Sequence, residues 1–468
     1  MNRVNPTHEG RLPGDAAFSG RIPGRTKRFP VAARAGFLIL ASVVAPVFLL
    51  LAAWRTSSQR YRHWLLTAFV TMYGATILIV YDPTGVGSDG VRHLLMVYEH
   101  YVGMSFAQFL SDLWHVLTFQ EASHFGVKDV YKHLVSYFVG GLLGAPQLFF
   151  VVISFVYGYF FTGSLLEIFR HVKWHRLNYV VFSLAALLFL VKNIEGVNTV
   201  RTWTGLWVLV FACLKYYDTK NPKYIFLMLL PPFIHYGYFL MLLPALLVLL
   251  IGNHPKTYAL LFLASSATTL INPGDMVDVI ETTERGAKAV SSYFVEEQMT
   301  LEERADWALN LQGRWYRDFQ FLGIQKWALN ILIYTLLAAG VYFSVMNYRQ
   351  RTLFSIGLMT LAFSNSTWFF YAVSNRSWLI GCVFILAAFV MARTHPSTGP
   401  RLLRSVPGYY TWGLHLSLIL FFPFFLYNLS IIIDYISAFM FVAPFIVWIE
   451  PDMNMSIKYV LQILLGIR

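Results

Sequence analysis

Residues Asn198–Leu247 read NTVRTWTGLWVLVFACLKYYDTKNPKYIFLMLLPPFIHYGYFLMLLPALL, and this stretch decides the fold. It consists of long apolar runs that a few polar side chains interrupt. Arg201 stands at the head of the first run, and His235 stands in the middle of the second. Because an unpaired polar group is costly in hydrocarbon, we expect both side chains to lie at a membrane surface or to line a functional cavity.

The chain as a whole has the composition of an integral membrane protein. Of its 468 residues, 57% are hydrophobic and 13% are charged, whereas a soluble domain has about 25% charged residues. Six apolar runs approach the roughly 20 residues that a helix needs to cross a bilayer; they are Ala35–Trp54, Trp64–Tyr81, Gln147–Phe169, Trp327–Met346, Leu353–Tyr371 and Tyr409–Leu426. Five shorter runs fit a thin bundle; they are Tyr179–Val191, Trp203–Tyr216, Tyr258–Ile271, Trp378–Met391 and Ile431–Trp448.

These runs predict an all-α, polytopic membrane protein of about 11–13 transmembrane helices. The membrane domain takes up residues 35–468. Residues 1–34 are basic and lack an apolar period, which predicts a disordered tail.

Several function classes are excluded by what the sequence contains. The net charge of +12 is typical of basic cytoplasmic loops, so we expect no nucleic-acid partner. Cys213 and Cys382 lie inside apolar runs and are expected to pack as small hydrophobic side chains. The sequence has no GxxxxGK[ST] loop, no HExxH, no CxxC pair and no long acidic run, so we expect no cofactor and no metal site.

The positive charge of the short loops predicts the orientation of the chain. Five short basic loops are assigned to the cytoplasm; they are Arg55–His63, Arg170–Arg176, Lys215–Lys223, Tyr348–Arg351 and Arg393–Arg404. The two long loops, at about 82–146 and 272–326, then belong on the outer face. Basic residues flank Ala35–Trp54 on both sides, which leaves two topologies open there: the tail is translocated, or Pro46 bends the helix into a hairpin.

The orientation holds only if the segment Tyr224–Ile251 is broken. Its length of about 28 residues would give a helix about 42 Å long, which exceeds one ordinary span. Pro231 and Pro232 each lack a backbone donor and break or kink a helix. We therefore expect two short helices that meet near Pro231–His235 at the outer surface, as membrane proteins tolerate where broken helices line a cavity.

With this orientation, polar side chains from distant parts of the sequence converge on the outer side. Guanidinium groups beside aromatic rings suit the binding of diphosphate and sugar. The candidate catalytic residues are His235 and Asp89; the candidate substrate-binding residues are Arg201, Arg376, Arg92, Asn198, Arg314, Trp315 and Arg317.

Each candidate also has a purely structural interpretation. Arg201 reaches a lipid headgroup or pairs with Glu195, and His235 caps the helix break with a hydrogen bond. Asp89 is the N-cap of a helix that begins near Val91. Arg376 anchors a helix end, and the arginines of the 272–326 loop are solvated.

Three stretches resemble a known family in their order and spacing. They are GSDGVRHLLMVYEHYVGMSFAQFL, then KDVYKHLVSYFVGGLLGAPQLFFVVISFVYGYFFTGSLLEIFR, and then the stretch quoted at the opening. Together, over Gly87–Leu250, they resemble the EpsG-type, Wzy-like polysaccharide polymerases of bacterial O-antigen, capsule and exopolysaccharide pathways. Asp89 falls on the outer acidic position of that family, Arg201 on its arginine and His235 on its histidine, whereas Thr202 stands where the family commonly has Gln.

The resemblance implies an enzyme that joins repeat-unit oligosaccharides carried on undecaprenyl pyrophosphate, at the outer face of the bacterial inner membrane. Such an enzyme is a metal-independent glycosyltransferase-type polymerase; its partners are the lipid-linked oligosaccharide, membrane lipid and a regulator of chain length. In this interpretation Arg201 holds the diphosphate, and His235 or Asp89 takes a proton from the attacking hydroxyl. Two alternatives remain open: another outer-face transferase with a polyprenyl-linked donor, such as an O-antigen ligase or a GT-C glycosyltransferase, and a lipid-linked oligosaccharide flippase or transporter.

Overall fold

The fold was described from a computed structural model. It describes residues 40, 44–78, 89–118, 129–172, 178–270, 323–368, 371–404 and 407–466, with the backbone alone at 89, 269, 270, 371, 372, 403 and 404. Within these ranges the chain is helical and forms no strand, and one isolated antiparallel bridge joins Ser437 to Ser456. The predicted tail at residues 1–34 and nearly all of the predicted 272–326 loop lie outside the described residues.

The helices follow the apolar runs of the sequence. The N-terminal half contains α2 (Val47–Arg55), α3 (Gln59–Ala75), α4 (Asp89–His100), α5 (Phe106–Leu117), α6 (Val130–Ser136), α7 (Phe149–Ile168), α8 (Tyr179–Val191), the short η4 (Ile194–Thr199) and α9 (Thr202–Thr219). The rest contains α10 (Lys223–Met228), α11 (Pro231–Ile234), α12 (Tyr238–Met241), α13 (Leu243–Ile251), α14 (Pro255–Ser265), α19 (Ile324–Ala338), α20 (Tyr348–Ser366), α21 (Tyr371–Thr394), α22 (Gly399–Arg404), α23 (Gly408–Tyr435), η7 (Ala438–Met440), α24 (Ile446–Ile449) and α25 (Ile457–Leu464).

Four of the described helical segments are long and apolar enough to cross a membrane; they are Pro146–Ile168, Tyr179–Thr199, Val373–Thr394 and Gly408–Tyr435. Three shorter apolar segments accompany them; they are Lys223–Ile234, Tyr238–Ile251 and Ile324–Ala338. Length and composition therefore indicate a membrane protein, in agreement with the prediction at this coarser level.

One predicted helix is wrong. The run Ile431–Trp448 does not form a short span of its own, because α23 continues through Pro423 to Tyr435 and the chain then turns. The turn contains η7 and a left-handed Ala443 with φ of 55°. The backbone N–H of Ala443 donates to Val44 O at 2.6 Å, so hydrogen bonds to the segment before α2 take the place of helical ones.

The centre of the bundle is α21, and α23 lies at its edge. In the most apolar window of each helix, 89% of the residues of α21 are buried but only 22% of those of α23. Helix α20 packs closely against α21 because two glycines face the other helix: a Cβ on Gly357 would lie 2.7 Å from Ile385 Cδ1, and one on Gly381 would lie 2.7 Å from Leu361 Cγ. Small residues at helix contacts are a general feature of membrane bundles.

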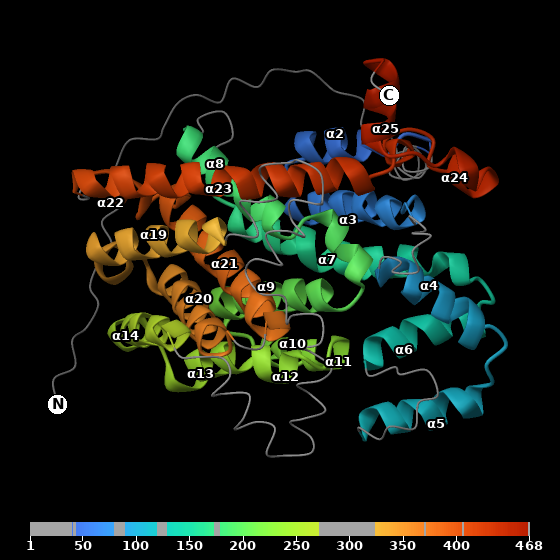
Figure 1. Ribbon diagram of the computed structural model, residues 1–468, viewed down its shortest axis with the longest axis horizontal. Coiled ribbons are helices and arrows are strands. Elements are labelled where there is room, and N and C mark those ends of the chain that lie inside the picture. Colours follow the sequence, from blue (N-terminus) through green and yellow to red (C-terminus); the bar gives the residue numbers. More distant parts are fainter. Residues whose placement is uncertain are drawn as a thin grey trace, which may run out of the picture.

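Figure 1 shows α23 running along one edge of the molecule, with α4, α5 and α6 gathered at one end and α22 at the other. The segment after α9 is broken as predicted, with α11 and α12 on either side of His235, whose backbone is extended (φ −150°, ψ 118°). Pro231 and Pro232 occupy the first positions of α11. Backbone N–H groups there have no acceptor within the helix, so the N–H that proline lacks costs no helical hydrogen bond. Helix α6 packs on α11 and α7, which brings the predicted 82–146 loop against this break.

Candidate functional site

The centre of the candidate site is Asp129, the residue before α6. Its Oδ2 forms an ion pair with Arg201 Nη1, and its Oδ1 lies 3.2 Å from His235 Nδ1. The backbone N–H of Tyr236 also donates to Oδ1, at 2.8 Å. The Asp129 side chain is fully buried, so one carboxylate holds the arginine and the histidine that the sequence had singled out.

A fourth side chain completes this Asp129 cluster. Arg376, from α21, places Nη1 3.3 Å from His235 Nε2. With Nδ1–H donated to Asp129, the Nε2 lone pair faces the guanidinium of Arg376 and accepts its hydrogen bond. His235 is thereby held in one tautomer and one orientation, as a base with a carboxylate behind it requires.

Arg201 is directed by an unusual turn. Val200 has φ of 58° and ψ of −52°, and Arg201 N donates to Thr199 O at 2.5 Å, which defines a three-residue γ-turn. A β-branched residue at positive φ is strained. The preceding η4 is fixed by Tyr157, whose hydroxyl donates to Asn193 O at 2.5 Å and accepts from Trp207 Nε1 at 3.0 Å.

The helix break that carries His235 is fixed from the other side by Tyr238. Its hydroxyl donates to Thr202 O at 2.7 Å, next to Arg201. Its ring rests on Gly205, where an added Cβ would lie 2.6 Å from Tyr238 Cε2. Arg201 and His235 are therefore tied to each other through α9 and α12 as well as through Asp129.

The position of Asp129 is fixed by the hydrogen bonds of His133, which belongs to the helices that precede the bundle. His133, one turn later in α6, contacts Tyr101 Oη through Nδ1 at 2.7 Å and Phe109 O through Nε2 at 3.1 Å. The two contacts fit Nε2–H as donor and Nδ1 as acceptor, and the ring stacks on Phe109 at 4.8 Å. His133 thus joins α4, α5 and α6 into one unit.

The electrostatics of the cluster keep Asp129 ionised and His235 neutral. Burial alone would raise the pKa of Asp129, but the hydrogen bond from His235 and the charge of Arg201 outweigh it and lower that pKa to about 2. Burial lowers the pKa of His235 despite the hydrogen bond to Asp129 that opposes it, and Arg201 and Arg376 lower it further. A neutral imidazole beside a carboxylate is the form that can accept a proton.

His93, on α4, is a further buried group beside the cluster. Burial, followed by the positive charges of Lys132, Arg201 and Arg92, lowers its pKa to about 2. Among the described groups that act on His93, three are cationic and one, Asp129, is anionic. This excess of positive charge favours an anion at this end of the molecule.

The predicted site residues have different outcomes. Arg201, His235 and Arg376 come together as described. Asn198 is buried, and its Oδ1 packs against Gly90 at the beginning of α4, so the backbone next to Asp89 lies near the Arg201 turn.

The other predicted residues are not seen in contact with the Asp129 cluster within the described part of the chain. Asp89 is the first residue of α4, and its side chain is outside the described part. Arg92 is exposed on α4. Arg314, Trp315 and Arg317 lie outside the described residues, and all of these roles stay predictions.

The candidate residues predicted from the sequence do not include Asp129, Lys132, His93 or the backbone N–H of Tyr236. A signal for two of them was present. Asp129, Lys132 and His133 recur at helical spacing on one face of a short helix just before an apolar run, and Lys132 and His133 are both buried. That spacing identifies a polar face turned towards the bundle.

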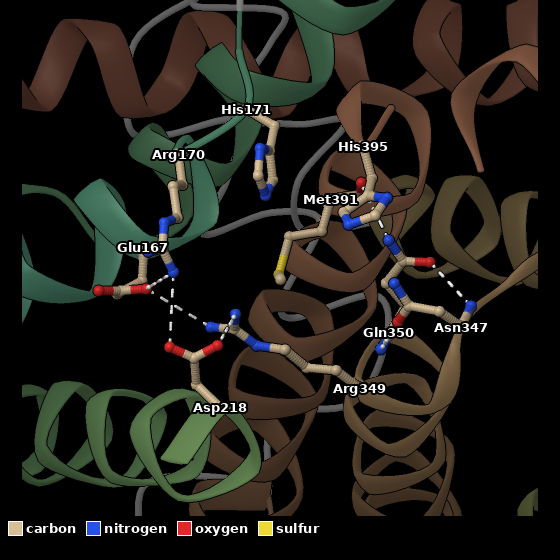
Figure 2. Close-up of a pocket in the computed structure, with 9 residues that line it drawn as sticks. All are labelled: Glu167, Arg170, His171, Asp218, Asn347, Arg349, Gln350, Met391 and His395. Carbon is tan, nitrogen blue, oxygen red and sulfur yellow. Dashed lines mark hydrogen bonds and ion pairs between the residues drawn. The ribbon is translucent and has the colours of Figure 1, made fainter. Parts of the chain in front are cut away.

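A second polar cluster lies at the opposite ends of α9 and α21, the two helices that also contribute to the Asp129 cluster. Figure 2 shows it around a cavity of about 270 Å³, with side chains from α7, α9, α20 and the end of α21. Glu167 pairs with Lys215 and lies 3.6 Å from Arg349 Nη2, and Asp218 lies 3.2 Å from Arg349 Nη1. Arg201 and Asp218 stand 17 residues apart along α9, a helical rise of about 26 Å, close to the thickness of a bilayer core.

This ionic cavity joins the short basic loops. Arg170, Asp218, Arg349 and His395 line it and come from four of the five loops assigned to the cytoplasm. The fifth loop contributes Arg62, which lines a larger cavity together with Arg170. The five loops therefore share one end of the molecule.

No family model, curated protein or solved structure matches this chain. An assignment of function therefore rests mainly on the geometry of the Asp129 cluster.

Proposed function

We propose that the protein polymerises oligosaccharide repeat units carried on undecaprenyl pyrophosphate, at the outer face of the bacterial inner membrane, as a polytopic enzyme. The observation that carries the proposal is the buried Asp129 carboxylate that holds Arg201 and His235 together. A histidine with a carboxylate partner is a general base, and guanidinium groups beside it suit a diphosphate leaving group. The resemblance over Gly87–Leu250 supports the same assignment.

The reaction uses the residues in two roles. A hydroxyl of the acceptor sugar gives its proton to His235 Nε2, and its oxygen attacks the anomeric carbon of the donor sugar. The bond from that carbon to the diphosphate oxygen breaks, and undecaprenyl pyrophosphate leaves with the electron pair. Arg201 and Arg376 bind the charge that develops on the leaving group.

Arg376 makes the availability of the His235 Nε2 lone pair depend on bound substrate. Its hydrogen bond to His235 Nε2 is long, at 3.3 Å. A diphosphate is a stronger partner for a guanidinium than a neutral imidazole is. Substrate therefore draws Arg376 away and frees the lone pair that the reaction needs.

Substitution of Arg201 tests the proposal. In a strain that lacks the native gene, Arg201→Ala should lower polymer yield about tenfold or more at unchanged protein abundance, because a charged hydrogen bond is worth roughly 1.5–3 kcal/mol. Arg201→Lys should rescue only part of this, since an ammonium cannot form the bidentate fork. Arg60→Ala, at an exposed arginine on α3, is the control and should leave the yield unchanged.

Carrier lipids separate polymerisation from the alternatives. A deletion strain should accumulate single repeat units on the outer-face carrier. Polymer that accumulates on the carrier would indicate a ligase, and units trapped on the inner face would indicate a flippase. Normal polymer in Arg201→Ala, at wild-type abundance, would remove the Asp129 cluster from the site.

A further inference from the structure

A large apolar groove lies among the helices of the bundle, and none of the four side chains of the Asp129 cluster lines it. Its volume is about 1100 Å³, and its walls come from α2, α3 and α7 on one side and from α8, α23 and η7 on the other. This volume slightly exceeds the roughly 300–1,000 Å³ found for small-molecule pockets. The groove is lined mostly by aliphatic and aromatic side chains, which suit the acyl chains of a lipid.

Apart from Thr162, whose hydroxyl donates to Gly158 O at 2.7 Å, the polar residues that line the groove gather at one end. Ser57, Gln59, Arg62 and Arg170 lie there, in two of the basic loops, and among the described residues that line the groove none is acidic. Arg62 is held in place because Nε donates to Ala53 O at 3.0 Å and Nη2 donates to Thr56 O at 2.6 Å, both at the end of α2. These carbonyls are neutral, so the positive charge of Arg62, together with that of Arg170, favours an anion at this end of the groove.

The depth of the groove corresponds to one leaflet. Along α3 the lining extends from Gln59 to Val70, and along α7 and its C-cap it extends from Phe161 to Phe169. These distances are eleven and eight residues, helical rises of about 16 and about 12 Å, compared with about 15 Å for half of a bilayer core. At the far end Phe69 packs on Phe441, with ring centroids 6.0 Å apart.

We propose that this groove binds an anionic diacyl phospholipid, with its phosphate on Arg62 and Arg170 and its acyl chains against α3, α7 and α23. The lipid belongs to the leaflet at the basic end of the molecule. This site is separate from the proposed polymerase site and does not depend on it. A carrier whose diphosphate lies at Arg201 would approach from the other end, where no charged residue is among the described residues that line the groove.

The lipid is coupled to the ionic cavity of Figure 2 through Arg170. Arg170 lines both cavities, and its Nη1 lies 3.5 Å from Asp218 and 3.8 Å from Glu167. A phosphate on the half-exposed guanidinium of Arg170 therefore adds an anion to a network that already joins α7, α9 and α20. Binding should stabilise the bundle as any ligand of the folded state does.

The test uses full-length protein purified in detergent and titrated in native mass spectrometry with phosphatidylglycerol or phosphatidylcholine of identical chains. Phosphatidylglycerol should bind about tenfold more tightly, as one additional charged contact predicts. Arg62→Gln should reduce this preference. Leu166→Trp, which fills the groove, should weaken both lipids, whereas Leu416→Trp on the exposed face of α23 should weaken neither.

Two results would overturn the assignment. Equal binding of the two phospholipids to the wild-type protein is the first, and this comparison needs no variant to fold. The second is displacement of phosphatidylglycerol by undecaprenyl phosphate, with loss of undecaprenyl phosphate binding in Leu166→Trp. This result would show that the groove binds the carrier lipid.

Discussion

Val200 is the residue whose conformation most needs an explanation. Its side chain is fully buried, and its φ of 58° lies in the region that β-branched residues avoid. Strain of this kind amounts to roughly 1–3 kcal/mol and persists only where the surrounding structure imposes it. Here the surrounding structure is η4 and α9, and the result is the direction of the Arg201 side chain.

Val200→Gly tests this role. The strain relieved, about 1–3 kcal/mol, nearly offsets the loss of a buried valine side chain, about 1.5–3 kcal/mol. We therefore expect a melting temperature close to that of the wild-type protein, together with polymer yield reduced about tenfold as Arg201 loses its fixed direction.

Val197→Gly is the matched control, since Val197 is equally buried in η4 and has no positive φ. It should lower the melting temperature. If both glycine variants lose stability equally, the turn at Val200 is not strained.

His93 makes stability depend on pH. Its pKa is about 2 in the folded protein and about 6.5 in an unfolded chain. Below about pH 6.5 the unfolded chain binds a proton that the folded protein does not, so the free energy of unfolding falls as pH falls. Asp129, with a pKa of about 2, stays ionised over the same range and adds a loss only below about pH 4.

The measurement is the melting temperature between about pH 4.5 and 6.5. The melting temperature of His93→Gln should fall less steeply with decreasing pH than that of the wild-type protein, because the variant takes up one proton fewer on unfolding. The exposed His254 is the control residue, and His254→Gln should leave the slope unchanged. An unchanged slope in His93→Gln would show that the folded protein protonates His93 near its ordinary pKa.

Residue types predicted part of the site and not its centre. Arg201, His235 and Arg376 stood out because cations are rare beside long apolar runs. Asp129 did not, because a carboxylate in a long polar loop looks solvated until the fold buries it. The contact between Asp129 and His235 joins residues 106 positions apart, and no local pattern in the sequence specifies such a distance.

At the level of elements, length and proline predicted the break near His235, because both act locally. Hydropathy failed at α23. The apolar runs Tyr409–Leu426 and Ile431–Trp448 predict two helices, whereas one helix of 28 residues continues past Pro423 to Tyr435. The segments that bond to the backbone after Tyr435, before α2 and around Ser456, are distant in sequence, so no local pattern shows where this helix ends.

Helix α5 is predicted to lie flat on the bilayer surface. Phe106, Leu110, Trp114 and Leu117 are exposed at 61%, 46%, 63% and 43% along one face, while Phe109 and Val116 face the protein. Figure 1 shows α5 at the edge of the molecule, beyond α6. A helix with an exposed apolar face of this kind binds at the membrane interface.

Spin labels in reconstituted protein test this placement. A label at position 114 should be more accessible to oxygen than to a polar nickel reagent. A label at Gln108, about 120° away around the helix, should show the reverse. Equal accessibility of both positions to the nickel reagent would place α5 in water.

For the whole molecule, the prediction concerns orientation. Native Cys213 and Cys382 are fully buried, so single introduced cysteines can be labelled against a low background. Thr300→Cys should be labelled by an impermeant reagent in intact cells, and Lys220→Cys only after the membrane is disrupted. The opposite pattern would place the basic loops outside and contradict the orientation.

The order in which the chain is made bears on the Asp129 cluster. Asp129 is synthesised first, Arg201 follows 72 residues later, and Arg376 follows His235 by 141 residues. At about 5–20 residues per second, translation takes roughly 7–28 s to proceed from His235 to Arg376. A chain that ends between His235 and Tyr348 contains the Asp129–His235 pair and lacks α20, α21 and α23, so a nonsense mutation there should yield a fragment with a partial site and no bundle to support it.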